Sequence, residues 1–199
     1  LGVDLDLEKT YIYVAFSQRK KNYLGVLGDG SFEIKGLTGK KSHVPPFIKT
    51  TFYESVNILS RVKSKSEFES AREEIKKTIK SRVSSLKNRE VPIEELAFNV
   101  MMSKSPDRYV DTVPQHVRAA RILQDKMGKE VKAGDIISYV KTSTISGVKP
   151  ISLASVKEID VTKYLDYLRS TFDQLLDALG YSFDEILGAT KLEDFFWSS

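Results

Sequence analysis

The sequence changes its hydrophobic pattern near residue 42, and this change constrains the fold more than any other feature. Before it, the run Tyr11-Ile12-Tyr13-Val14-Ala15-Phe16 and the segments 23–27 and 31–35 are rich in strand-forming residues. After it, apolar residues recur at three- and four-residue steps, which is the spacing of amphipathic helices. We therefore predict an α+β fold, with a small antiparallel β piece over residues 1–42, a mainly helical domain over 43–188 and a tail over 189–199.

Capping and stop residues place the helices. Proline is tolerated in a first turn, so Pro45-Pro46 predicts the start of one helix, and Ser66-Glu67-Phe68-Glu69 predicts a capping box for the next. A third helix should run from Pro114 to Met127, and the last two should end at Gly180 and Gly188. We predict strands at 96–101 and 135–141 and a Ser/Thr/Gly-rich connection over 142–155. The helix residues predicted to be buried are Ile48, Phe52, Val56, Leu59, Val62, Phe68, Ala71, Ile75, Ile79, Leu86, Val117, Ala120, Leu123, Leu165, Leu168, Phe172, Leu175, Leu176 and Leu179.

Composition sets the class of protein. With 199 residues, 41% of them apolar, the chain is long enough for a real core, and a net charge of +4 with a pI near 9.0 leans toward polyanionic partners. It contains no cysteine, which excludes disulfides, thiolate zinc sites and cysteine nucleophiles. We expect a cytoplasmic, nucleoid-associated protein that does not use a membrane. The chain begins at Leu1 without an initiator methionine, so we expect a piece of something longer or a mature product.

Two lysine pairs flank a hairpin signal. Lys20-Lys21, with Tyr23 close behind, precede the turn Gly28-Asp29-Gly30, and Lys40-Lys41 follow it. We expect the pairs at opposite ends of one short antiparallel unit, from which they can point toward the same ligand. Closely spaced phosphates attract such ammonium groups, and a tyrosine hydroxyl can bond to phosphate or sugar without reading a base. The alternative is a solvated surface hairpin.

The same segment resembles family B DNA polymerases, and the archaeal members most closely. Lys-Lys-x-Tyr, a turn and then Gly36-Leu37-Thr38-Gly39-Lys40-Lys41 are similar to the segment that closes the palm of these enzymes. The thumb is matched, in order, by Val91-Pro92-Ile93-Glu94-Glu95-Leu96, Pro114-Gln115-His116-Val117 and Gly134-Asp135-Ile136-Ile137-Ser138-Tyr139-Val140. The resemblance implies the C-terminal palm and the thumb of a DNA-directed DNA polymerase that holds primer–template duplex during replication.

The resemblance also implies roles for particular residues. Lys20, Lys21 and Tyr23 would hold the primer–template near the newly made end, with Lys40 and Lys41 on backbone phosphates. A polar loop of the thumb would grip the duplex further back through Lys104, Arg108, Tyr109 and Thr112, with His116 packing or touching the duplex beside it. That loop departs from the family pattern at Pro106 and Asp107. His43 has no serine nucleophile and carboxylate in a recognisable pattern around it, so we interpret it as structural.

Metal chemistry is expected elsewhere in the complete enzyme. Phosphoryl transfer uses carboxylate-held metal ions, and this chain lacks the Tyr-Gly-Asp-Thr-Asp turn that supplies them in the family. The implied Mg²⁺ would be held mainly by the remaining polymerase polypeptide, and this chain alone should be inactive. Asp4 and Asp6 match a pair of acidic positions proposed for an accessory metal ion. A solvated strand face is the favoured interpretation of that pair.

The last residues resemble a sliding-clamp peptide. Leu192, Phe195 and Phe196 supply one aliphatic and two aromatic anchors of the kind that enter a preformed groove. The family pattern begins with glutamine, where this chain has Ala189. The alternative is a tail folded onto its own domain through Phe195, Phe196 and Trp197.

Two other functions are compatible with this sequence. A basic sheet with an aromatic residue beside a helical domain can serve as a stand-alone nucleic-acid-binding module without catalysis. A scaffold whose only contact is the tail would be indifferent to Lys20→Ala with Lys21→Ala.

Overall fold

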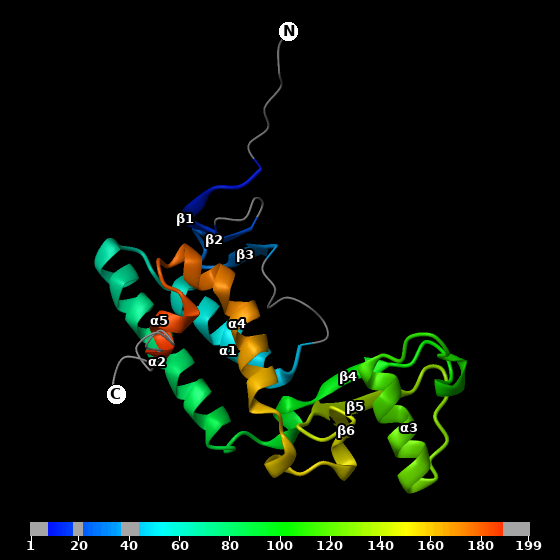
Figure 1. Cartoon of the computed structure of the whole chain (residues 1–199). Helices are drawn as coiled ribbons and strands as arrows, with labels where there is room; N and C mark the ends of the chain where they lie inside the picture. Colours follow the sequence, from blue (N-terminus) through cyan, green and yellow to red (C-terminus); the bar gives the residue numbers. More distant parts are fainter. Residues whose placement is uncertain (1–7, 18–21, 37–43, 189–199) are drawn as a thin grey trace, which may run out of the picture. The chain divides into compact units, whose positions relative to one another are not determined.

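The computed structural model describes residues 8–17, 22–36 and 44–188, and it confirms the α+β fold (Figure 1). The chain divides into two compact units, each assembled from separate stretches of sequence. Unit 1 takes residues 1–40, 51–82 and 169–199, and unit 2 takes 41–50 and 83–168. The domain boundaries predicted at 42/43 and 188/189 concern functional parts and stay a prediction.

Unit 1 contains an antiparallel sheet of β1 (Tyr11–Phe16), β2 (Tyr23–Leu27) and β3 (Phe32–Lys35), in that order. The three strands are those that the sequence predicts. Tyr23 pairs with Phe16 and with Lys35, so the start of β2 and the end of β3 lie at the same end of the hairpin. The chain therefore enters and leaves the β2–β3 hairpin at the same end. The lysine pairs predicted to lie at opposite ends of this unit are outside the described residues.

Four helices lie wholly or partly in unit 1: α1 (Pro46–Ser60), α2 (Lys65–Lys87), α4 (Val161–Ala178) and α5 (Phe183–Leu187). Within unit 1, buried apolar residues of these helices form a core, in which the rings of Phe52 and Phe172 meet edge to face with centroids 5.9 Å apart. The inner face of the sheet packs on this core through Ala15, Leu24, Val26 and Ile34, which are all buried.

The capping box of α2 differs from the prediction by two residues. The backbone amide of Glu67 donates to the Ser64 hydroxyl at 3.3 Å, and the backbone amide of Ser64 donates to the Glu67 carboxylate at 3.0 Å. Ser64, not Ser66, therefore caps the helix. The box at Ser182 and Glu185, which begins α5, is as predicted, and Gly188 ends that helix in the left-handed conformation.

Unit 2 has a second antiparallel sheet, β4 (Phe98–Met101), β5 (Ile136–Lys141) and β6 (Val148–Pro150), with α3 (Gln115–Met127) packed on β5 and β6. Helix α3 begins after Pro114 and ends at Gly128, as predicted, with Val117, Ala120 and Leu123 buried. The strand predicted from Leu96 starts two residues later, because Leu96 closes a short 3-10 turn. The predicted connection over 142–155 contains β6, which the sequence analysis missed.

The burial of two residues predicted to lie in the core, Leu165 and Phe68, differs from the prediction. Tyr164 is fully buried and Leu165 only partly, because the Tyr164 hydroxyl donates to the Leu96 carbonyl at 2.7 Å and draws its own side chain into the core of unit 2. Phe68 is likewise half-buried. None of the helices in the described parts of the chain combines the length and apolar character needed to cross a membrane.

Candidate nucleic-acid interface

The loop between β4 and α3 brings together three of the residues predicted to grip a duplex. The Lys104 ammonium lies 4.4 Å from the centroid of the Tyr109 ring, in cation–π contact with it. The same ring meets the His116 ring at the start of α3 in a T-shaped arrangement, with centroids 6.3 Å apart and an interplanar angle of 89°. Lysine, tyrosine and histidine therefore form one cluster of unit 2, which we call the loop cluster.

Arg121 braces this loop from α3. Its guanidinium donates to the carbonyl oxygens of Pro106, at 3.0 Å, and Tyr109, at 2.8 Å. The hydroxyls of Ser103 and Tyr109 are also bonded, 2.9 Å apart. A planar guanidinium presents donors in a fixed geometry, so it fixes the backbone on both sides of Arg108. Sequence reasoning missed Arg121, because nothing in residue type or spacing marks an arginine that bonds to backbone carbonyls.

The other predicted thumb contacts, Arg108 and Thr112, are exposed on the same loop. They lie among mixed charges, since Asp107 and Asp111 are exposed there as well. Pro106, where the chain departs from the family pattern, is buried and opens a 3-10 turn that ends at Arg108. The loop therefore presents cationic and hydroxyl groups from a defined backbone.

Tyr23 belongs to the other unit. It is half-buried on the outer face of the β1–β3 sheet, where its ring meets Tyr11 and Phe16 with centroids 6.2 and 6.1 Å away. Phe16 is 70% exposed, so this face carries an accessible aromatic surface. The lysines predicted to act with Tyr23, namely Lys20, Lys21, Lys40 and Lys41, lie outside the described residues.

The remaining predicted sites also lie outside the described residues: Asp4, Asp6, His43, Leu192, Phe195 and Phe196. Their roles stay predictions. In residues 8–17, 22–36 and 44–188 there is no group of three or more histidine, cysteine, aspartate or glutamate side chains able to hold a metal ion.

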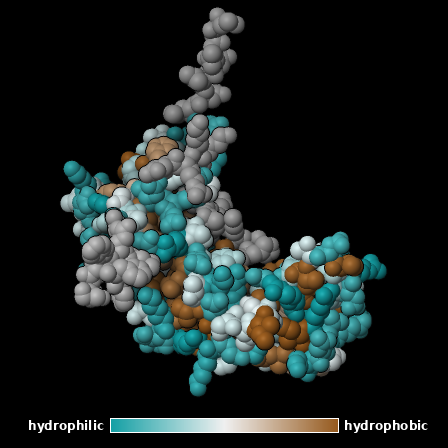
Figure 2. Space-filling model, in the orientation of Figure 1, coloured by the Kyte–Doolittle hydropathy of each residue, from teal (hydrophilic) through white to brown (hydrophobic). Residues whose placement is uncertain are grey.

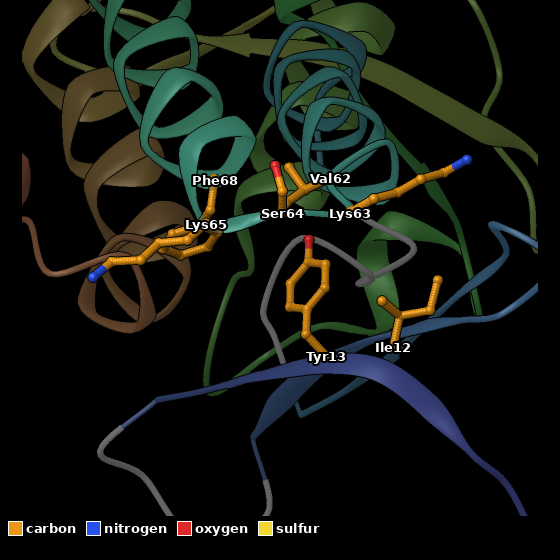
Figure 3. Close-up of a pocket in the computed structure, with 7 residues that line it drawn as sticks. All are labelled: Ile12, Tyr13, Val62, Lys63, Ser64, Lys65 and Phe68. Carbon is orange, nitrogen blue, oxygen red and sulfur yellow. The ribbon is translucent and has the colours of Figure 1, made fainter.

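A cavity of about 370 Å³ opens between β1 and the connection from α1 to α2. Figure 3 shows Tyr13 pointing toward this connection, while the side chains of Lys63 and Lys65 extend away on either side. The Tyr13 hydroxyl donates to the Leu59 carbonyl, and burial raises the pKa of Tyr13 to about 12. The lining combines the apolar residues Ile12, Val62 and Phe68 with Tyr13, Ser64 and two lysines, and it contains no histidine, aspartate or glutamate.

Apolar side chains on the surface of unit 2 are few and mostly separate. Figure 2 shows them as brown patches between polar areas. The exposed large apolar residues of this unit are Met101, Val110, Met127, Ile136 and Ile145, of which Met101 and Ile136 are neighbours across β4 and β5. Single exposed apolar residues are normal on soluble domains, so this surface does not by itself mark a partner site.

Known proteins match nearly the whole chain. DNA polymerase 1 from Saccharolobus solfataricus is 44% identical over 195 residues, which cover 98% of this chain and 22% of that protein. DNA polymerase 1 from Sulfolobus acidocaldarius is 42% identical over 197 residues, covering 99% of this chain and 22% of that protein. This chain therefore spans about a fifth of the length of these relatives.

The fold agrees with a solved structure. The family B DNA polymerase from the hyperthermophilic archaeon Pyrobaculum calidifontis superposes with a TM-score of 0.61 and 25% identity, over 94% of this chain and 22% of that one. The sequence profile of DNA polymerase family B matches residues 2–179, which include every described strand and the four longer helices. The chain belongs to DNA polymerase family B.

Proposed function

We propose that this chain is the C-terminal part of the palm and the thumb of a DNA-directed DNA polymerase, and that it holds primer–template duplex by its backbone phosphates. The family match over residues 2–179 carries the proposal. Phosphoryl transfer depends largely on positioning and electrostatics, so a part that only holds the duplex contributes to catalysis without touching the reacting atoms.

The loop cluster supplies the chemistry that such a grip needs. Lys104 provides a cation for a phosphate, Tyr109 provides a ring and a hydroxyl, and neither group reads a base edge in doing so. Arg121 holds the loop backbone in place before any ligand arrives, at N–O distances of 2.8 and 3.0 Å. Less conformational entropy is then lost on binding. The grip is therefore expected to be insensitive to sequence and sensitive to salt.

The other parts of the proposal concern groups outside the described residues. Mg²⁺ would be held mainly by aspartates in the remaining polymerase polypeptide, which would be the catalytic partner of this chain. Lys20, Lys21, Lys40 and Lys41 would add phosphate contacts beside Tyr23, and Asp4 and Asp6 would contribute at most an accessory metal ion. Leu192, Phe195 and Phe196 would engage a sliding clamp.

Equilibrium binding of the 199-residue chain to primer–template duplex and to single strand, across a salt series, tests the grip. We expect a preference for duplex and a linear fall of log K with log salt concentration. In Lys104→Ala/Arg108→Ala the slope should become about 1.8 less steep, since each neutralised phosphate contributes about 0.9. The triple variant Lys20→Ala/Lys21→Ala/Tyr23→Ala should also flatten the slope.

A charge-matched control separates a local grip from general attraction. Lys126→Ala/Lys129→Ala removes two exposed cations from the same unit, away from the loop cluster. It should leave the slope nearly unchanged. If both double variants flatten the slope equally, or if neither does, the loop that carries Lys104 and Arg108 is not the grip.

A further inference from the structure

A group of side chains around Gly25 lies on the outer face of the β1–β3 sheet, opposite the core. Antiparallel partners point to the same face, so Gly25, its partner Glu33, Tyr23 and Phe16 share this side. The inner side carries the buried residues Ala15, Leu24 and Val26. The outer group is therefore not needed to fill the core of unit 1.

An irregularity in β1 turns Tyr11 onto this outer face. Residues two apart on a regular strand share a face, which would place Tyr11 with Tyr13. The register between β1 and β2 shifts between these two residues. Tyr13 consequently points inward to Leu59 and Phe68, while Tyr11 points outward to Tyr23 and Glu33. Such bulges commonly re-aim a side chain at a functional surface.

Glycine at position 25 makes room for the Tyr11 ring. A β-carbon there would lie 2.5 Å from both Cδ1 and Cε1 of Tyr11, closer than such atoms can approach. The ring therefore lies directly over the backbone of Gly25. No left-handed φ requires glycine at this position, so the ring explains its use here.

The Tyr11 hydroxyl is anchored at its far end. It donates to the Glu33 carboxylate, which also forms an ion pair with the Lys9 ammonium at 3.1 Å. The hydrogen bond from Tyr11, followed by Lys9, holds the pKa of Glu33 below its ordinary value, and the same bond raises the pKa of Tyr11. Ring and hydroxyl are thus both fixed, by Gly25 on one side and Glu33 on the other.

We propose that Tyr11, seated over Gly25 and tied to Glu33, is a positioning residue that holds the Tyr23 ring for contact with the nucleic-acid backbone. The edge of one ring meets the other at 79°, with centroids 6.2 Å apart, and Phe16 supports Tyr23 from the opposite end of β1. A ring held before binding loses less rotamer freedom when it meets its ligand. The inference rests on the proposed function, in which Tyr23 contacts the duplex.

A double-mutant cycle on duplex affinity tests this coupling. Tyr23→Ala should weaken binding about fivefold, as for the loss of one hydrogen bond and a ring contact. Tyr11→Ala should weaken binding about threefold in the native background and not at all when Tyr23 is already alanine. Tyr11→Phe should weaken binding less than Tyr11→Ala, because it keeps the ring contact with Tyr23 but removes the hydroxyl that bonds to Glu33 and interacts with Tyr23. Thermal melting of each variant shows whether the chain stays folded.

A glycine pair supplies the matched control. Gly25→Ala should displace the Tyr11 ring and weaken binding as Tyr11→Ala does, whereas a β-carbon at Gly28, in the same hairpin, would meet nothing within 4 Å. Gly28→Ala should therefore bind as the native chain does. Should Gly25→Ala prevent folding, the cycle between Tyr11 and Tyr23 still decides.

The outcomes separate this inference from the proposed function. If Tyr23→Ala leaves affinity unchanged, Tyr23 does not contact the duplex and both ideas fail at this site. If Tyr23→Ala weakens binding but Tyr11→Ala does not, or if the two effects simply add, Tyr11 does not act through Tyr23 and only the positioning role is overturned.

Discussion

Lys141 is a charged residue in the core of unit 2. It lies on β5, is only 8% exposed, and places its ammonium 4.4 Å from the Tyr167 ring centroid and 5.4 Å from that of Phe98. Burial, followed by repulsion from Lys163, lowers the pKa of Lys141. Aromatic faces therefore compensate part of the cost of removing this cation from water.

Replacing Lys141 separates the contribution of its hydrocarbon stem from that of its charge. Lys141→Met keeps most of the stem, removes the buried charge and allows sulfur–aromatic contact, so its free energy of unfolding should stay within about 1 kcal/mol of the native value. Lys141→Ala removes most of the stem and should lose about 2 kcal/mol, at roughly 0.8 kcal/mol per buried methylene. Urea unfolding measures both. Equal losses in the two variants would show that the charge itself holds this site.

The contribution of Lys141 to the free energy of unfolding should change with pH in a definite direction. Because the folded pKa lies below the unfolded value of 10.5, the unfolded chain binds more protons between the two values. The native chain should accordingly gain stability from this group as pH rises through its folded pKa, up to 10.5. The Lys141→Met variant should lack that contribution.

At the scale of elements, the start of α2 offers a second test. Ser64 and Ser66 are each followed three residues later by glutamate, and only Ser64 makes the reciprocal bonds with Glu67. Ser64→Ala should cost about 1 kcal/mol of stability, the usual loss for an N-cap serine. Ser66→Ala should stay within about 0.5 kcal/mol, because alanine is a good helix former at an exposed position.

Chemical denaturation of the two serine variants side by side measures this difference. The substitutions are chemically identical and two residues apart, so each is the control for the other. A larger loss in Ser66→Ala than in Ser64→Ala would mean that the helix begins where the sequence pattern first suggested.

The elements show which kinds of structure local pattern can predict. Strands β1–β3 and both ends of α3 follow from β-forming runs, Pro114 and Gly128, which act on their own neighbours in sequence. The Ser-x-x-Glu pattern occurs at both Ser64 and Ser66, and the prediction of Ser66 as the cap of α2 is wrong. The three residues of β6 are too few for periodicity to mark. Tyr164 was missed because its burial depends on a carbonyl 68 residues away.

The candidate site likewise contains residues that the sequence predicted and residues that it did not. Lys104, Tyr109 and His116 were predicted only through the resemblance, and the structure shows that the three side chains meet. Arg121 and Tyr11 were not predicted, since one acts by bonding to carbonyls across a loop and the other depends on a bulge. Tertiary geometry of this kind leaves no trace in local composition.

At the scale of the whole molecule, several tyrosines keep their protons to higher pH when the chain is folded. Burial raises the pKa of Tyr13, in unit 1, and of Tyr139, in unit 2, to about 12 each, and the pKa values of Tyr11, Tyr164 and Tyr181 are also raised. Below the ordinary value of 10.0 both folded and unfolded chains are protonated, and this stability is fully present. Above it the unfolded chain releases protons first, so the free energy of unfolding should fall as pH rises from 10 toward 12.

Tyrosine-to-phenylalanine variants show which tyrosines cause the fall in the free energy of unfolding above pH 10. Tyr139 stacks on Phe98 with centroids 5.4 Å apart, so Tyr139→Phe keeps the stacking, should leave stability near neutral pH almost unchanged and should make the alkaline decline shallower. Tyr13→Phe also removes the hydrogen bond to the Leu59 carbonyl, so it should lower stability near neutral pH, and this deficit should shrink as pH rises from 10 toward 12. Urea unfolding at stepped pH, with tyrosinate absorbance as a second signal, measures both effects.

Because α1, α2 and α4 each contribute residues to both units, loss of one unit removes part of the helices of the other. We therefore expect the alkaline destabilisation to appear as one cooperative transition, in which variants from either unit shift the same midpoint. Two separated transitions, with Tyr13→Phe moving only one and Tyr139→Phe only the other, would instead show that each unit folds independently. A stability that stays constant between pH 10 and pH 12 would contradict the raised tyrosine pKa values themselves.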